Sequence, residues 1–218
     1  MRRLLFVCVG FFLALFLARS APLALLVFDS RIVQPGRLPD GWRIKVVHGN
    51  PDASVIHDAQ GGVLHLKSRS SSYSIEHAED VDPAQFPYLT WKWKVTELPR
   101  GGDLRNASTD DQAAQLIVAF ADRRILDYIW DSTAPANTVQ SVSVIPFVHV
   151  FAFVCRSGPA DLNRWIPEVR NVSADYEQVF GHKPAQHVKG IRIQINSQHT
   201  GTFAESYFSD VAFRNAVN

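Results

Sequence analysis

The acidic pair Asp110 and Asp111 stands where a turn-rich loop leads into an apolar run, residues 116–120. A carboxylate at such a junction can accept backbone N–H bonds, coordinate a hard cation such as calcium, or act as a general acid or base. Side chains alternate along a strand, so at most one of the pair points inward. We interpret the pair as a loop cap. A calcium site would need ligands from distant residues, and we predict no cofactor.

Residues 165–181 hold the densest set of polar groups in the chain. Arg170 lies at the exit of a predicted strand, and Asp175 falls in the first turn of a predicted helix. Such a pair can form two parallel hydrogen bonds that fasten helix to sheet. We favour this structural role, and a ligand-binding cluster at the rim of the fold is the alternative. The polar members are Glu168, Arg170, Asn171, Asp175 and Tyr176.

Tryptophans offer a broad ring face on which a sugar can stack. Trp91 and Trp93 share one face of the predicted strand 89–95 with aliphatic residues, which is typical of a core. Trp130 and Trp165 stand beside charged residues and are the better candidates for a ligand site. Packing in the fold nevertheless remains the favoured role for both.

We find no strong catalytic motif: the sequence has no G-x-S-x-G, H-E-x-x-H, P-loop or dinucleotide fingerprint. The eight histidines show no metal-ligand spacing. An enzyme would therefore need acid and base groups that converge from distant parts of the chain. The candidates are Asp111, Glu168, Asp175 and His199.

The composition is that of ordinary globular protein, with 218 residues, 46% hydrophobic and 20% charged. A net charge of +1 without a basic cluster gives no support to nucleic acid as a partner.

The first twenty residues resemble a secretory signal. Arg2 and Arg3 precede an apolar run, residues 4–17, and small residues follow up to Ser20. We predict cleavage near Ser20, which leaves residues 21–218 as a single domain with one cysteine and no intramolecular disulfide. The expected location is periplasmic or secreted. A retained membrane anchor is the alternative, and it would be the protein's one contact with a membrane.

Short alternating segments separated by turn residues fill the rest of the chain, without amphipathic helices between them. This pattern predicts an all-β fold, an antiparallel β-sandwich of jelly-roll type with an outline like galactose-binding and lectin modules. One short helix is expected near 174–180, capped by Ser173 at its start and by Gly181 at its end.

The chain carries, in this order, Trp91-x-Trp93, Asp110-Asp111, Tyr128-x-Trp130, the segment 165–181 and Tyr207-Phe208-x-Asp210. This order resembles a bacterial exported family catalogued as domain of unknown function 3047. The likeness spans residues 28–213 and implies an envelope or secreted protein, without an established activity. Gln115 stands where members carry an arginine, and residues 196–200 lack the carboxylates of an acid-rich turn, which would weaken a cation site there.

We hypothesise a non-catalytic envelope protein that binds a glycan or another polar ligand at the loops of the sandwich. A jelly-roll hydrolase or lyase that uses Asp or Glu residues is one alternative, and a structural envelope component without a small ligand is another. The candidate ligand-binding residues are Asp110, Asp111, Trp130, Trp165, Glu168, Arg170, Asn171, Asp175 and Tyr176.

Overall fold

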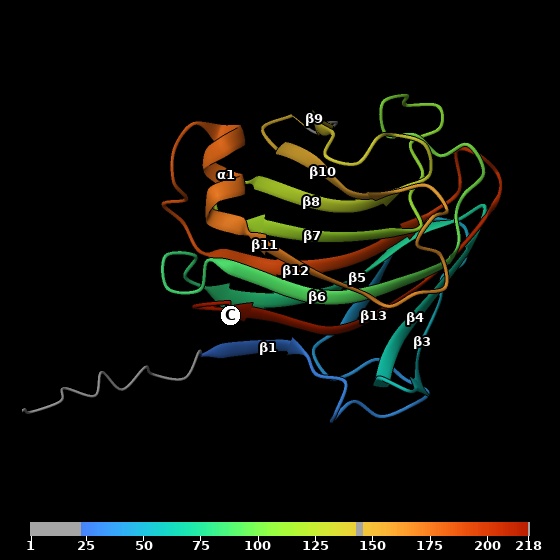
Figure 1. The fold of residues 1–218 in the computed structure, drawn as a ribbon, viewed down its shortest axis with the longest axis horizontal. Helices are drawn as coiled ribbons and strands as arrows, with labels where there is room; N and C mark the ends of the chain where they lie inside the picture. The colour runs from blue at the N-terminus through green and yellow to red at the C-terminus, as the bar shows by residue number, and fades with distance from the viewer. Residues whose placement is uncertain (1–22, 143–145, 218) are drawn as a thin grey trace, which may run out of the picture.

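The computed structural model describes residues 23–142 and 146–217, so the predicted signal over residues 1–20 lies outside the described residues. Two sheets pack face to face and form a β-sandwich (Figure 1). This confirms the predicted jelly-roll class. Within the described part of the chain, no helix is long and apolar enough to cross a membrane.

One sheet has six strands. Its order is β11 (Ile166–Asn171), β6 (Tyr88–Glu97), β13 (Phe203–Arg214), β4 (Gly61–Arg69) and β3 (Asp52–Asp58), and β1 (Ala24–Phe28) pairs with the final residues of β13.

The other sheet has seven strands. Its order is β2 (Arg43–His48), β5 (Ser72–Val81), β12 (Val188–Asn196), β7 (Ala114–Phe120), β8 (Arg124–Asp131), β10 (His149–Ser157) and β9 (Val139–Ser141). Neighbouring strands are antiparallel except β8 and β10, which run parallel. This pair departs from the antiparallel arrangement that the sequence predicts.

The inner faces of the two sheets meet in an aromatic core. Trp91 and Trp93 are 1% and 0% exposed, which confirms their predicted interior position. Their rings lie 5.3 Å apart, edge to face, and Tyr128 stacks on Trp91 at 5.5 Å. Such offset and edge contacts are the favourable arrangements for aromatic rings. The alternating side chains of β6 and β8 therefore fix which residues face inward, and their neighbours in sequence face outward.

The one helix of the described residues, α1 (Val172–Phe180), stands at one end of the sandwich, where it contacts β6, β8 and β11 (Figure 1). Its N-cap is Asn171, whose side chain accepts a bond from the amide of Ala174. The predicted cap, Ser173, lies inside the helix, and its hydroxyl donates to the carbonyl of Pro83. Asn and Ser are both common N-cap residues, so the sequence did not decide between them, and the predicted N-cap lies two residues after the observed one. Gly181 ends the helix with φ 79°, as predicted.

Candidate binding site on the outer face of the seven-stranded sheet

Polar side chains from three adjacent strands gather on the outer face of the seven-stranded sheet. The register sets Ile117 of β7 between Arg192 of β12 and Asp127 of β8. The next outward row holds Gln194 and Gln115 side by side. Because alternate residues of a strand share a face, all five side chains point away from the core.

A cavity of about 230 Å³ lies over this face. We call it the Asp127 cavity. One side is apolar and comes from β8, β10 and the flanking loops, with Ile129 and Ala152 among its residues. The other side is polar. Its polar residues are Asp110, Gln112, Gln115, Asp127, Arg192, Gln194 and Asn196.

Asp127 has unmet hydrogen-bonding capacity. It is 8% exposed, and its Oδ1 has no hydrogen-bond partner among the described residues. Burial, and secondarily the negative charge of Asp110, raise the pKa of Asp127 to about 8, with a small opposing effect from Arg192. At neutral pH this carboxyl group therefore carries its proton and can both donate and accept a hydrogen bond.

Asp110 is held at the cavity by a network of amides. The Oδ1 of Asn196 accepts from the Gln112 backbone amide at 2.9 Å and from Gln115 Nε2 at 2.6 Å. The Nδ2 of Asn196 donates to the Asp110 carbonyl at 2.9 Å, and Gln112 Nε2 donates to Asp110 Oδ1 at 2.8 Å. Burial raises the pKa of Asp110, and the bond from Gln112 partly opposes that effect. The loop before β7 is thus fixed to β12.

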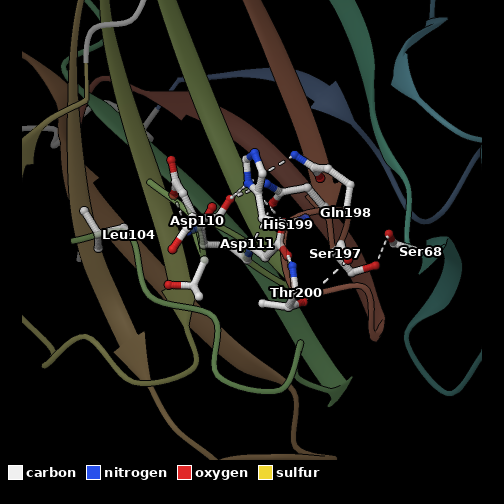
Figure 2. A network of polar contacts seen from close by, with 12 residues as sticks. Ser68, Leu104, Asp110, Asp111, Ser197, Gln198, His199 and Thr200 are labelled. Carbon is white, nitrogen blue, oxygen red and sulfur yellow. Dashed lines mark hydrogen bonds and ion pairs between the residues drawn. The ribbon is translucent and has the colours of Figure 1, made fainter. Parts of the chain in front are cut away.

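Asp111, the other member of the pair, has a structural role. Its carboxylate is fully buried and accepts the backbone amides of His199 at 3.3 Å and Thr200 at 2.6 Å. It caps a turn, as we predicted for the pair, but the turn is the one between β12 and β13. In Figure 2, Asp110 lies on the side of this network nearer Leu104, a cavity residue, while Ser68 marks the opposite end.

No group of three His, Cys, Asp or Glu side chains that could hold a metal ion occurs within residues 23–142 and 146–217. The carboxylates of the acidic pair serve the Asp127 cavity and the β12–β13 turn separately.

Arg170 and Asp175 form the bidentate pair that the sequence predicts. Arg170 Nε and NH2 donate to the two carboxylate oxygens of Asp175 at 2.9 and 2.6 Å. The hydroxyl of Tyr128 donates to the same carboxylate at 2.8 Å. The cluster joins α1 to β8 and β11, which supports the structural interpretation over a ligand site at the rim.

Three further candidates are also committed to contacts within the fold. Glu168 Oε1 accepts from Arg156 Nε at 2.7 Å and from Trp93 Nε1 at 3.2 Å. Asn171 caps α1, and the buried Tyr176 donates its hydroxyl proton to Asp122.

The hydrolase alternative built on Asp111, Glu168, Asp175 and His199 is therefore wrong for these residues. Each carboxylate is occupied by arginine, tyrosine, tryptophan or backbone donors. His199 approaches Asp111 at 3.6 Å and belongs to the β12–β13 turn. A buried carboxylate with its bonds satisfied has little capacity left for a substrate.

Trp130 was predicted as a ligand-binding residue, but it lies in the core. It is 0% exposed, packs 5.9 Å from Trp93 and donates its indole N–H to the carbonyl of Gly158 at 3.1 Å. Position 130 shares the inner face of β8 with Tyr128, so no ring face is open to a sugar.

Trp165 lies over the outer face of the six-stranded sheet. Its ring packs against Tyr207, with centroids 6.5 Å apart, and Lys94 Nζ lies 5.0 Å from its centroid. The indole N–H donates to Asp58 Oδ2 at 3.1 Å. Trp165 is thus remote from the Asp127 cavity.

Sequence reasoning missed the side chains that line the cavity, apart from Asp110. One available signal was Asp127 itself, an acid between Ile125 and Ile129 in an otherwise apolar row of β8. The alternation around Arg192 and Gln194 was visible, but it also fits an ordinary solvated face.

The fold and the cavity together define a jelly-roll β-sandwich with a polar site on one sheet. The chain belongs to the family described as "Protein of unknown function (DUF3047)", whose model matches residues 40–212. A search of curated proteins gives no match.

Among solved structures, the chain is similar to the xyloglucanase domain of NopAA, a type three effector from Sinorhizobium fredii, in complex with cellobiose. The TM-score is 0.51 at 8% identity, over 81% of this chain and 94% of that chain. It is also similar to the family 11 carbohydrate-binding module of Lic26A-Cel5E from Clostridium thermocellum, with a TM-score of 0.48 at 10% identity, over 91% and 98%. At 8% identity, the similarity to the NopAA domain shows a shared fold alone.

Proposed function

We propose that this protein binds a glycan in the Asp127 cavity. The observation that carries the proposal is the buried carboxyl group of Asp127, whose Oδ1 has no partner among the described residues while it lines a cavity. A buried polar group without a partner costs free energy, and a ligand that supplies a hydrogen bond recovers that cost.

The chemistry of the lining suits sugar hydroxyl groups, each of which donates one hydrogen bond and accepts others. Gln194 carries an amide group with donors and an acceptor, and its Nε2 donates to Gln115 Oε1 at 3.2 Å while Gln115 Nε2 donates to Asn196. Arg192 adds a guanidinium donor at the edge, where it also bonds Glu76 at 2.8 Å. Gln112 and Asn196 have donors and acceptors as well, but most of these already bond Asp110, Gln115 or the backbone.

An elongated ligand fits better than a single sugar. A second cavity of about 210 Å³ shares Ile125 and Arg192 with the first and continues along the same face toward Arg43, Glu76 and Lys189. The two adjoining cavities are each below the roughly 300 Å³ at which drug-sized sites begin. A chain of sugar units could occupy both, and the shared fold with a xyloglucanase domain solved with cellobiose supports this reading.

We also propose a periplasmic or secreted location, because residues 1–20 have the composition of a secretory signal. N-terminal sequencing of the protein recovered from cell envelope and medium should then begin near Ala21. An intact Met1 terminus in the cytoplasm would contradict this location.

A glycan array followed by calorimetry tests the binding proposal. Loss of one hydrogen bond of about 1.4 kcal/mol in Gln194→Ala should weaken binding of the best array ligand about tenfold. The control is Gln85→Ala, an exposed amide outside both cavities, which should bind as the wild type does. The proposal fails if the wild type binds no glycan, or if Gln194→Ala and Arg192→Ala both leave the affinity unchanged.

A further inference from the structure

We propose that the Asp127 cavity also hydrolyses the glycan it binds, with Asp127 as the proton donor to the glycosidic oxygen and Asp110 as the base that activates water. This inference rests on the proposed binding function and assigns a reaction to the same cavity. The hydrolase residues expected from the sequence were Asp111, Glu168, Asp175 and His199. The proposed pair is instead Asp110 and Asp127, which both line the cavity.

The first argument is that Asp127 differs from the other buried acids. Asp29, Asp111, Asp131 and Asp175 each accept two or more hydrogen bonds from arginine, tyrosine or backbone groups. Asp127 is about as buried as Asp29 and Asp175, but its Oδ1 has no partner among the described residues. A structural acid needs its partners, whereas a proton donor needs an open oxygen for its substrate.

The second argument is that two carboxyl groups share the cavity but come from different surroundings. Asp127 projects from β8 beside Ile125 and Ile129. Asp110 lies at the end of the preceding loop, where an amide holds its Oδ1 at 2.8 Å. Burial favours the neutral acid in both groups, and only Asp110 has an amide donor that opposes this effect.

The order in which the two groups lose their protons agrees with these roles. The pKa of Asp127 rises to about 8 mainly through burial, and the negative charge of Asp110 adds to the shift. Because the charge of Asp110 contributes to the raised pKa of Asp127, Asp110 is the first of the two to lose its proton, although burial raises the pKa of Asp110 as well. Two carboxyl groups whose environments separate their pKa values can serve as acid and base at the same pH.

The reaction then balances with water as the co-reactant. Asp127 gives its proton to the glycosidic oxygen as the bond from that oxygen to the anomeric carbon breaks, and the bond electrons leave with the oxygen. Asp110 takes a proton from water, whose oxygen forms the new bond to the anomeric carbon. One glycoside and one water become two shorter sugars. A proton passes from Asp110 back to Asp127 through solvent and restores the starting state.

The test uses xyloglucan, cellohexaose and every glycan that the array identifies, with released reducing ends as the readout. Asp127→Asn keeps the shape and the hydrogen bonding of the acid but cannot transfer a proton. We expect the turnover of this variant to fall about 10²- to 10⁴-fold, with glycan affinity within about threefold of the wild type. Turnover of a 2,4-dinitrophenyl glycoside, whose leaving group needs no acid, should fall far less.

Asp110→Asn supplies an independent measurement without substrate. By carbon NMR of the Asp127 carboxyl, removal of the neighbouring charge should shift the titration of Asp127 to lower pH. An unchanged titration would show that the two groups are not coupled and would overturn the assignment of Asp110.

The outcomes separate the two proposals. A wild-type protein that binds a glycan but releases no reducing ends from it overturns hydrolysis and leaves binding intact. A protein that binds no glycan overturns both. Full turnover in Asp127→Asn would remove Asp127 from the reaction.

Discussion

The outer faces of the two sheets differ in how far their own side chains satisfy one another. On the six-stranded sheet, Lys94 Nζ lies 4.2 Å from the centroid of Tyr207, and His65 stacks on the same ring at 4.2 Å. His65 also bonds Glu205 at 2.7 Å. On the seven-stranded sheet, Asp127 lines a cavity, and its Oδ1 has no partner among the described residues. Aromatic side chains therefore point to one outer face as a ligand site, and a buried carboxyl group with an open oxygen points to the other.

A larger cavity on the other sheet does not reverse this comparison. It measures about 650 Å³ and lies beside β1, β6 and β11. Its charged groups are paired within the fold: Lys92 bonds Asp210 at 3.0 Å, and Arg31 bonds Asp29 at 2.6 Å. The indole N–H of Trp91 has no partner among the described residues there, and Glu168, which lies opposite Trp91 on β11, bonds Arg156 and Trp93 through its Oε1. The volume of a cavity is thus a weaker indication of a ligand site than the hydrogen bonding of the side chains that line it.

The largest expected effect is the pH dependence of the difference in unfolding free energy between the wild type and Asp127→Asn, which tests the contrast between the two faces. An aspartate in the unfolded chain has a pKa of about 3.9, against about 8 in the folded protein. Between these values the folded state holds one more proton, so stability from this group falls as pH rises and levels off above pH 8. The advantage of the asparagine variant should grow by about 1.4 kcal/mol per pH unit over that window.

Urea unfolding of both proteins at pH 4, 6, 8 and 9 measures this difference. The pH 4 point is the internal control, since Asp127 is then protonated in the folded state and about half protonated in the unfolded state. A difference that stays constant from pH 4 to 8 would mean that Asp127 is an ordinary solvated acid, and the contrast between the two faces would disappear.

The substitution Asp175→Ala tests the structural role of the cluster formed by Arg170, Asp175 and Tyr128. It leaves Arg170 without its carboxylate and the buried hydroxyl of Tyr128 without its acceptor. Because Arg170 is partly exposed, we expect unfolding free energy to fall by about 3 kcal/mol, at the low end for a broken buried pair.

Asp161→Ala is the matched control, because its partners Arg156 and Arg164 are more exposed; we expect about 0.5 kcal/mol. Glycan affinity measured by calorimetry should stay unchanged in both variants. A loss of affinity in Asp175→Ala, with its fold intact, would move the site to the helix end of the sandwich.

Trp165→Ala tests the six-stranded face directly. The half-buried ring contacts Tyr207 and Lys94, so its removal should lower the unfolding free energy by about 1 kcal/mol. Glycan binding should persist, because the ring lies on the opposite sheet from Asp127. Loss of binding here, with Gln194→Ala unaffected, would assign the glycan to the aromatic face.

The sequence predicts what depends on local periodicity. The alternation in residues 89–95 placed Trp91 and Trp93 in the core, and the glycine at 181 marked the end of the helix. In β8 both faces are largely apolar, so the pattern could not tell that Trp130 faces inward. The candidate site could not be predicted from the sequence, because only the register of β12, β7 and β8 brings Arg192 and Asp127 to the same part of one face.

The smallest effect concerns the start of α1, where sequence and structure disagree on the cap. Asn171→Ala removes the acceptor of the Ala174 amide and should cost about 1 kcal/mol. Ser173→Ala removes a bond to the Pro83 carbonyl and should cost about as much, so stability alone does not separate them. Hydrogen exchange does: the Ala174 amide should exchange faster in Asn171→Ala and at the wild-type rate in Ser173→Ala. Faster exchange in the serine variant alone would restore Ser173 as the cap. Unchanged glycan binding in both variants would indicate that α1 stabilises the fold and takes no part in the glycan site on the face that carries Asp127.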